Sequence, residues 1–116
     1  MKVGDYVRTH SGCICKIVNI NEFREPIMKY GIEASYLKDI AFIGDEDIKK
    51  SGEKIKAVLE VGDVITTINL CGEITKIDGD RIYTTCYDGE YCSSEDIKTV
   101  VTKEQFKQIE FEVNQI

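Results

Sequence analysis

The chain has 116 residues, 42% of them hydrophobic, and a formal net charge of −6. This length suits one compact unit or two very small ones that share a core. The acidity argues against direct binding to DNA or RNA, because binding to their backbone relies on lysine and arginine. Apolar runs of about 18 residues, the length of a membrane span, do not occur. The start of the chain lacks the apolar core of a signal peptide, so we expect a cytoplasmic protein.

An internal repeat organises the sequence. Three short motifs occur twice in the same order: Val-Gly-Asp at 3–5 and 61–63, Gly-x-Ile-x-Lys-Ile at 12–17 and 72–77, and Glu-Asp-Ile-Lys at 46–49 and 95–98. Matches that keep their order indicate two copies of one structural unit. We therefore expect a first copy at 1–50, a linker at 51–60 and a second copy at 61–116, packed as one unit.

The first copy has the pattern of a series of short strands. Residues 2–9 and 13–20 predict two strands joined by a turn at His10–Gly12. The second of these strands is expected to place Ile14 inward, with a bulge that brings Ile17 to the same side. Pro26 marks a loop or an edge. Further strands are expected on both sides of a tight turn at Gly31, continuing to Ile43.

Two short helices are expected outside the strands. In the linker, Ser51 is a candidate N-cap for a helix whose apolar residues Ile55, Val58 and Leu59 recur at helical spacing. Near the end of the chain, Thr102 and Gln105 have the spacing of a capping box. The alternation of apolar and charged residues at 109–113 predicts a terminal strand.

In the second copy, strands are expected at 61–68, 73–77 and 81–87. Turns are expected at 69–72, at 78–80 and at Asp88-Gly89, the strongest hairpin signal of the chain. Several short strands joined by hairpins predict a mainly β protein. We therefore expect tandem SH3-like small barrels with two short helices.

Three segments carry a resemblance to a known group of proteins. The segments Val61-Gly62-Asp63, Glu95-Asp96-Ile97 and Val101-Thr102-Lys103-Glu104-Gln105-Phe106 resemble a widespread group of small proteins encoded by phages and prophages of Firmicutes. The likeness covers roughly residues 46 to 113. Several phage proteins of this size and acidity inhibit host defence, and anti-CRISPR proteins are among them. The resemblance thus implies a phage-encoded protein in the neighbourhood of such inhibitors.

The five cysteines are the one group of residues with possible metal chemistry. Zinc takes four thiolate or imidazole ligands in a tetrahedron. Turns at the same end of a meander would bring thiols together, with a fourth ligand from the first copy. The candidate ligands are Cys13, Cys15, Cys71, Cys86 and Cys92. The alternative is that the cysteines are small half-buried hydrophobic residues.

Acidic and aromatic side chains are the candidates for binding a partner. Clustered carboxylates fit a partner with a basic surface, and exposed tyrosines fit the apolar part of an interface. The predicted partner-binding residues are Asp45, Glu46, Asp47, Tyr87, Tyr91, Glu110 and Glu112.

No phosphate loop, carboxylate pair or nucleophile motif stands out, so the sequence favours binding over catalysis. The leading prediction is a phage-encoded inhibitor of a bacterial defence system, an anti-CRISPR protein that binds an RNA-guided nuclease of the host. The alternative is a non-enzymatic SH3-like binding module of a prophage with a structural or regulatory role.

Overall fold

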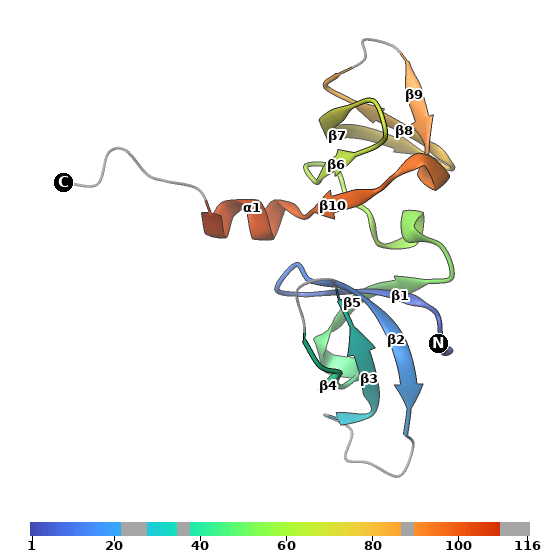
Figure 1. The fold of residues 1–116 in the computed structure, drawn as a ribbon, viewed down its shortest axis with the longest axis vertical. Helices are drawn as coiled ribbons and strands as arrows, with labels where there is room; N and C mark the ends of the chain where they lie inside the picture. Colours follow the sequence, from blue (N-terminus) through green and yellow to red (C-terminus); the bar gives the residue numbers. More distant parts are fainter. Residues whose placement is uncertain (22–27, 35–37, 87–89, 110–116) are drawn as a thin grey trace, which may run out of the picture. The chain divides into compact units, whose positions relative to one another are not determined.

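A computed structural model of the chain describes residues 1–21, 28–34, 38–86 and 90–109. The chain divides into two compact units, Met1–Leu59 and Glu60–Ile116. Each unit contains one five-stranded antiparallel sheet (Figure 1). The mainly β class predicted from the sequence is confirmed.

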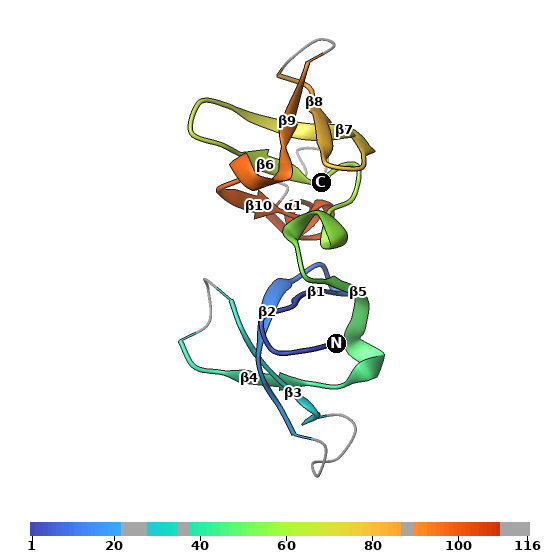
Figure 2. The same cartoon turned by 90° about the vertical axis from the view of Figure 1, so that its right-hand side faces the viewer.

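The first unit arranges its strands in the order β4-β3-β2-β1-β5. The sheet is strongly curved, as Figure 2 shows. Its strands are β1 (Tyr6–Thr9), β2 (Ile14–Ile20), β3 (Tyr30–Glu33), β4 (Ala41–Ile43) and β5 (Ile48–Gly52). Two 3-10 helices stand before and after β5, η2 (Asp45–Asp47) and η3 (Ile55–Val58).

The second unit has the order β10-β6-β7-β8-β9. Its elements are β6 (Val64–Thr66), β7 (Cys71–Asp78), β8 (Arg81–Thr84), β9 (Tyr91–Ser93), the 3-10 helix η4 (Ser94–Asp96), β10 (Thr99–Val101) and α1 (Lys103–Ile109). Each strand therefore has a counterpart in the first unit, and a 3-10 helix precedes the last strand in both. This shared topology supports the predicted tandem repeat. Strand pairing among the described residues leaves both sheets open, so it does not close them into barrels.

The Val-Gly-Asp motif has the same structural task in both units. Gly4 and Gly62 adopt φ angles of 95° and 99°, a backbone conformation that residues with a Cβ rarely adopt. The aspartate that follows closes the turn, because the Asp5 Oδ2 accepts from the Lys2 N–H at 3.0 Å and the Asp63 Oδ2 from the Glu60 N–H at 2.9 Å. The motif thus recurs because it forms the same turn before the first strand of each unit.

The Gly-x-Ile-x-Lys-Ile motifs, in contrast, are not equivalent in space. The Gly4 N–H donates to the Ile17 carbonyl at 2.8 Å, and the Gly62 N–H donates to the Ile74 carbonyl at 2.9 Å. Ile17 therefore corresponds to Ile74, whereas the motif implies Ile77. The alignment of the motifs was wrong by three residues, because isoleucine and lysine fit many positions of a half-buried strand.

Strand β2 buries Cys15 and Ile17 and leaves Ile14 half-buried. The expectation that Ile14 points inward with Ile17 was wrong, since regular alternation already brings Cys15 and Ile17 to one face. The bulge lies later, where pairing with β3 shifts between Ile17 and Asn19. Strand β7 has the matching shift between Ile74 and Lys76.

Gly31 lies inside β3, whereas the sequence predicted a turn at this residue. It pairs with Phe42 on β4. A Cβ at Gly31 would approach Asn19 Cβ and Ile40 Cγ2 to 3.2 Å, so the missing side chain lets these neighbours cover the strand.

The helices differ in part from expectation. Residues Ile55–Val58 form a 3-10 helix with Lys54 before it, and Ser51 lies in β5, so Ser51 does not cap it. The capping box is confirmed: the Gln105 N–H donates to Thr102 Oγ1 at 3.2 Å, and the Thr102 N–H donates to Gln105 Oε1 at 3.1 Å. The predicted terminal strand begins at Ile109, which ends α1; its other residues lie outside the described ones.

Each unit has its own apolar core. In the first unit, Val7, Cys15, Ile17, Tyr30 and Ile32 form one buried cluster. The second unit buries Ile65, Ile74 and Ile82 completely. No helix in the part of the chain that the structure describes has the length and apolarity needed to cross a membrane.

Candidate functional site

The same hollow occurs at the same place in both units. In the first unit it lies between the β1–β2 turn, β4 and η2, and we call it groove 1; its volume is about 570 Å³. In the second unit it lies between the β6–β7 turn, β9 and η4, and we call it groove 2; its volume is about 350 Å³. Groove 1 is lined by Thr9, His10, Ser11, Cys13, Ile32, Ala41, Phe42, Ile43, Glu46 and Asp47. Groove 2 is lined by Thr67, Ile68, Asn69, Leu70, Tyr91, Cys92, Glu95, Asp96 and Lys98.

A threonine shapes the turn on one side of each groove. Thr9 Oγ1 accepts a hydrogen bond from the Cys13 N–H at 3.0 Å, and Thr67 Oγ1 accepts one from the Leu70 N–H at 3.3 Å. Threonine favours such turns because its hydroxyl satisfies a backbone donor locally. The equivalent hydrogen bonds show that Thr9 and Thr67 have the same role.

The 3-10 helix on the other side carries a glutamate followed by an aspartate. Asp47 Oδ2 accepts from the Gly44 N–H at 3.0 Å, and Asp96 Oδ2 accepts from the Ser93 N–H at 3.4 Å. Both aspartates therefore cap their own helix. Both glutamates and both aspartates are exposed and line the grooves. Glu46 and Glu95 are the two without a capping role, so their carboxylates are available to a partner.

Asp45, the third acidic residue predicted for the first unit, has a structural contact. The Tyr30 hydroxyl donates to Asp45 Oδ1 at 2.7 Å. This hydrogen bond, more than burial, raises the pKa of Tyr30. Of the three predicted acidic residues, Glu46 is thus the one whose carboxylate has no capping or tyrosine contact among the described hydrogen bonds.

Tyr91, also predicted as a partner-binding residue, lines groove 2 and is 52% exposed. Its ring meets that of Tyr83 edge to face, with centroids 5.8 Å apart, and the Arg81 guanidinium lies 4.9 Å from its centroid. Such contacts hold a ring in place and suit a tyrosine for an interface. The other predicted partner residues, Tyr87, Glu110 and Glu112, lie outside the described residues.

The five cysteines that were predicted to bind zinc are divided between the two units. Cys13 and Cys15 belong to the first unit, and Cys71, Cys86 and Cys92 to the second. Cys92 pairs with Ile82 on the inner face of its sheet, whereas Cys71 is exposed. Among the described residues, no group of three or more His, Cys, Asp or Glu side chains is placed to hold a metal ion. This arrangement gives the zinc prediction no support; metal analysis of the purified chain tests it.

Packing explains the Cys15 thiol, which belongs to the buried core of the first unit. Cys15 pairs with Val7 and Gly72 pairs with Ile65, so these two positions are equivalent. A Cβ at Gly72 would lie 2.9 Å from Cys86 Sγ, so the sulfur of Cys86, an exposed residue, lies beside the position where Gly72 has no side chain. The second unit therefore has a glycine where the first unit has an inward cysteine.

The Cys15 thiol is expected to make the free energy of unfolding depend on pH in the alkaline range. Burial, with a smaller contribution from Cys13, raises its pKa from 9.0 to about 11. The folded state thus holds a proton that the unfolded state releases near pH 9. Stability from this group is complete below pH 9 and is expected to fall by roughly 2 kcal/mol as pH rises to 11.

Urea unfolding of the parent and of Cys15→Ala between pH 8 and 11 measures this effect. The parent is expected to lose stability more steeply than the variant over that range. Tyr30, whose pKa is also raised, acts in the same direction in both proteins and cancels in the comparison. Equal slopes would contradict the assignment.

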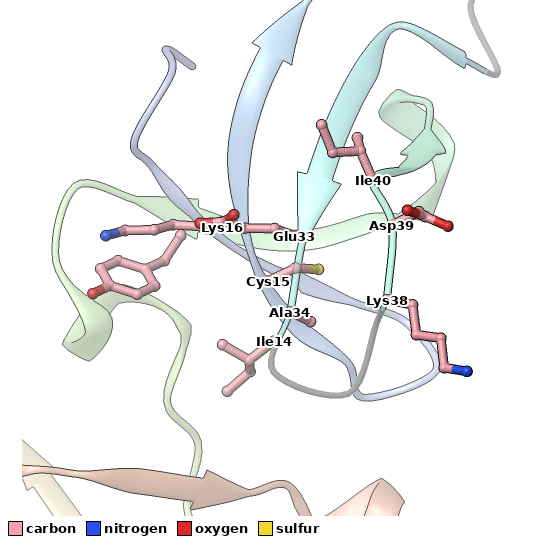
Figure 3. A pocket seen from close by; sticks show the side chains of 9 residues that line it. Ile14, Cys15, Lys16, Glu33, Ala34, Lys38, Asp39 and Ile40 are labelled. Atoms are coloured by element: carbon pink, nitrogen blue, oxygen red, sulfur yellow. The ribbon is translucent and has the colours of Figure 1, made fainter.

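A third hollow, of about 460 Å³, lies elsewhere in the first unit (Figure 3). Its charged lining residues are two lysines, Lys16 and Lys38, and two acids, Glu33 and Asp39. In Figure 3, Lys16 and Glu33 point to the same side, away from Lys38. The Lys16 ammonium lies 5.2 Å from the Tyr6 ring centroid. This hollow has balanced charge and, within the described residues, offers no convergent reactive groups.

Groove 1 holds a histidine, a serine and a cysteine, residue types that serve as base and nucleophile in some enzymes. Their contacts here are structural. The His10 N–H of the backbone donates to the Asp47 carbonyl at 3.1 Å, and the Ser11 hydroxyl contacts both Thr9 Oγ1 at 2.9 Å and Cys13 Sγ at 3.8 Å. Among the described residues no hydrogen bond joins His10 to Cys13, so the pair required for an activated nucleophile is not assembled.

Comparison with models of protein families, with curated proteins and with solved structures finds no match to this chain. The resemblance to phage and prophage proteins therefore stays a prediction.

Glu95 and Asp96 were not predicted from the sequence as site residues. The signal was present, because the Glu-Asp-Ile-Lys motif occurs in both copies. If the first Glu-Asp pair is a candidate for binding a partner, the repeat makes the second pair a candidate as well. What the sequence did not reveal is that the aspartate of each pair is used as a cap.

Proposed function

We propose that the chain is a non-enzymatic protein-binding module that holds a basic segment of a partner in an acidic groove. The observation that carries this proposal is the recurrence of one groove, between the first hairpin turn and the 3-10 helix, in both units. Each groove has an exposed glutamate at its edge, where a basic segment would meet it. Glu46 supplies this charge in groove 1.

The fold favours binding as well. The strand order of each unit, with a 3-10 helix before the last strand, is the order that we expect of an SH3-like small barrel. Domains of that kind bind extended peptides in grooves lined by aromatic residues. Phe42 in groove 1 and Tyr91 in groove 2 occupy equivalent positions, since they pair with Gly31 and Tyr83.

A direct test uses a short fluorescent peptide of alternating arginine and leucine. Binding measured by fluorescence anisotropy is expected to weaken as salt rises, because exposed charges are screened within about 8–10 Å at ordinary ionic strength. Glu46→Lys is expected to weaken binding in groove 1 about tenfold, which corresponds to roughly 1.4 kcal/mol.

The matched control is Glu33→Lys. Glu33 is exposed on β3 and does not line groove 1, yet its reversal changes the net charge by the same amount. An equal loss of binding in both variants would mean that overall acidity, and not the groove, attracts the peptide.

A narrower version of this proposal is the phage-encoded inhibitor of an RNA-guided nuclease. It is favoured by the net charge of −6, because such nucleases hold their guide–target duplex in a positively charged channel. DNA cleavage by nucleases of plausible hosts, with the protein in excess over a salt series, tests it. Full cleavage at low salt would rule out the inhibitor function and leave the proposal of a binding module.

A further inference from the structure

The second unit has the elements that make groove 1 a binding site. Glu95 stands where Glu46 stands, exposed on the 3-10 helix, and Asp96 caps that helix as Asp47 does. The turn across the groove is shaped by Thr67, as it is by Thr9. Because the same turn, strand and helix surround both hollows, what groove 1 can bind, groove 2 can bind as well.

The two grooves differ in strength of attraction. Both grooves have two carboxylates in their lining, and groove 1 has the larger volume, about 570 Å³. Groove 2 measures about 350 Å³, and Lys98 offsets part of its negative charge. Its turn presents Ile68, which is 80% exposed, where groove 1 presents His10. Groove 2 therefore gains an apolar contact and loses electrostatic attraction relative to groove 1.

We propose that the chain is bivalent: each unit binds one basic segment, with the tighter site in groove 1, and the natural partner presents two such segments. This inference rests on the proposed function, since both sites take the same chemistry. Charge complementarity selects the occupant, because each groove has an exposed glutamate at its rim and the whole chain is acidic. The apolar lining, with Phe42 and Ile43 in one groove and Leu70 and Tyr91 in the other, favours segments that mix basic and apolar residues.

Bivalence has a measurable consequence for affinity. Once one segment is bound, a second segment on the same partner is held near the other groove at an effective concentration that reaches millimolar for short flexible linkers. Two weak sites can thus give one firm complex, and loss of either glutamate removes the gain.

The test is isothermal titration calorimetry of the full chain with the single arginine–leucine peptide. At peptide concentrations that fill the parent but not a site weakened tenfold, we expect two peptides per chain for the parent, one for Glu46→Lys, one for Glu95→Lys and no measurable binding for the double variant. The changes Glu46→Gln and Glu95→Gln keep the size of the side chain, so they separate loss of charge from any effect of lysine. Glu46 and Glu95 are both exposed, and far-ultraviolet circular dichroism verifies that the variants are folded.

Matched controls are Glu33→Lys in the first unit and Glu73→Lys in the second, both exposed and outside the grooves. They are expected to retain two peptides per chain. One peptide per chain in the parent, lost in Glu46→Lys alone, would overturn bivalence and leave the proposed function intact. No binding by the parent would instead contradict the proposed function itself.

Discussion

Replacing Ile74 by alanine is expected to unfold the second unit or to bring it close to unfolding. Ile74 has no exposed surface and lies at the start of the bulge where β7 meets β8. Removing a buried isoleucine side chain costs about 2–5 kcal/mol. A unit of this size has little stability to lose, so the change is of the same order as the whole free energy of unfolding.

The same substitution at Ile17, the equivalent residue of the first unit, is expected to act on that unit. Peptide-resolved hydrogen exchange measures each unit separately: Ile74→Ala should accelerate exchange mainly in residues 60–109, and Ile17→Ala mainly in residues 1–59. Thr75→Ala, on an exposed neighbour of Ile74, should change little. Equal exchange in Ile74→Ala and Thr75→Ala would contradict the core that the structure describes.

Substituting Gly52 by alanine is expected to cost about 1–3 kcal/mol, the usual cost of overpacking. A Cβ at Gly52 would clash with the Cβ of Ala57, and that atom cannot rotate away because it is attached directly to the backbone of η3. The helix must therefore move. Urea unfolding of Gly52→Ala, of Ala57→Gly and of the double variant measures the effect.

The double variant is the internal control. It exchanges the two partners of the contact, so it should be more stable than the sum of the single changes predicts. Additive losses would mean that the two residues do not touch in solution.

The recurrence of the motifs was recognisable from the sequence, and the structure shows the backbone task behind each of them. Gly4 and Gly62 need a positive φ, and Asp47 and Asp96 accept from a nearby N–H, a role that the sequence did not reveal. Few residue types do these tasks, so the motifs recur. The capping box of Thr102 was recognisable for the same reason.

The register of the inner strands was less predictable. Ile14 and Ile17 are both compatible with an inward position, and only the pairing of Val7 with Cys15 shows which face is buried. In the second unit, Gly72 takes the place of Cys15, and the sulfur of Cys86, from another part of the chain, lies beside it. A contact between separate positions of the chain leaves no local pattern in the sequence.

The grooves were also hard to predict, because each is lined by residues that are far apart in the sequence. Groove 1 joins the turn at His10 to β4 and to Glu46, which are far apart in the chain. The acidic residues were recognisable in the sequence, but only as one uniform charged cluster. The structure divides them into residues that cap or hold a tyrosine and a glutamate that faces the groove.

Chemical-shift mapping of the ¹⁵N-labelled chain with the arginine–leucine peptide shows where a basic segment binds in both units at once. We predict shifts in two sets of amides, at 9–13 and 41–47 around groove 1 and at 67–70 and 91–98 around groove 2, with the first set changing at lower peptide concentration. Shifts confined to other surfaces, such as the exposed residues of β7 and β8, would contradict binding in the grooves.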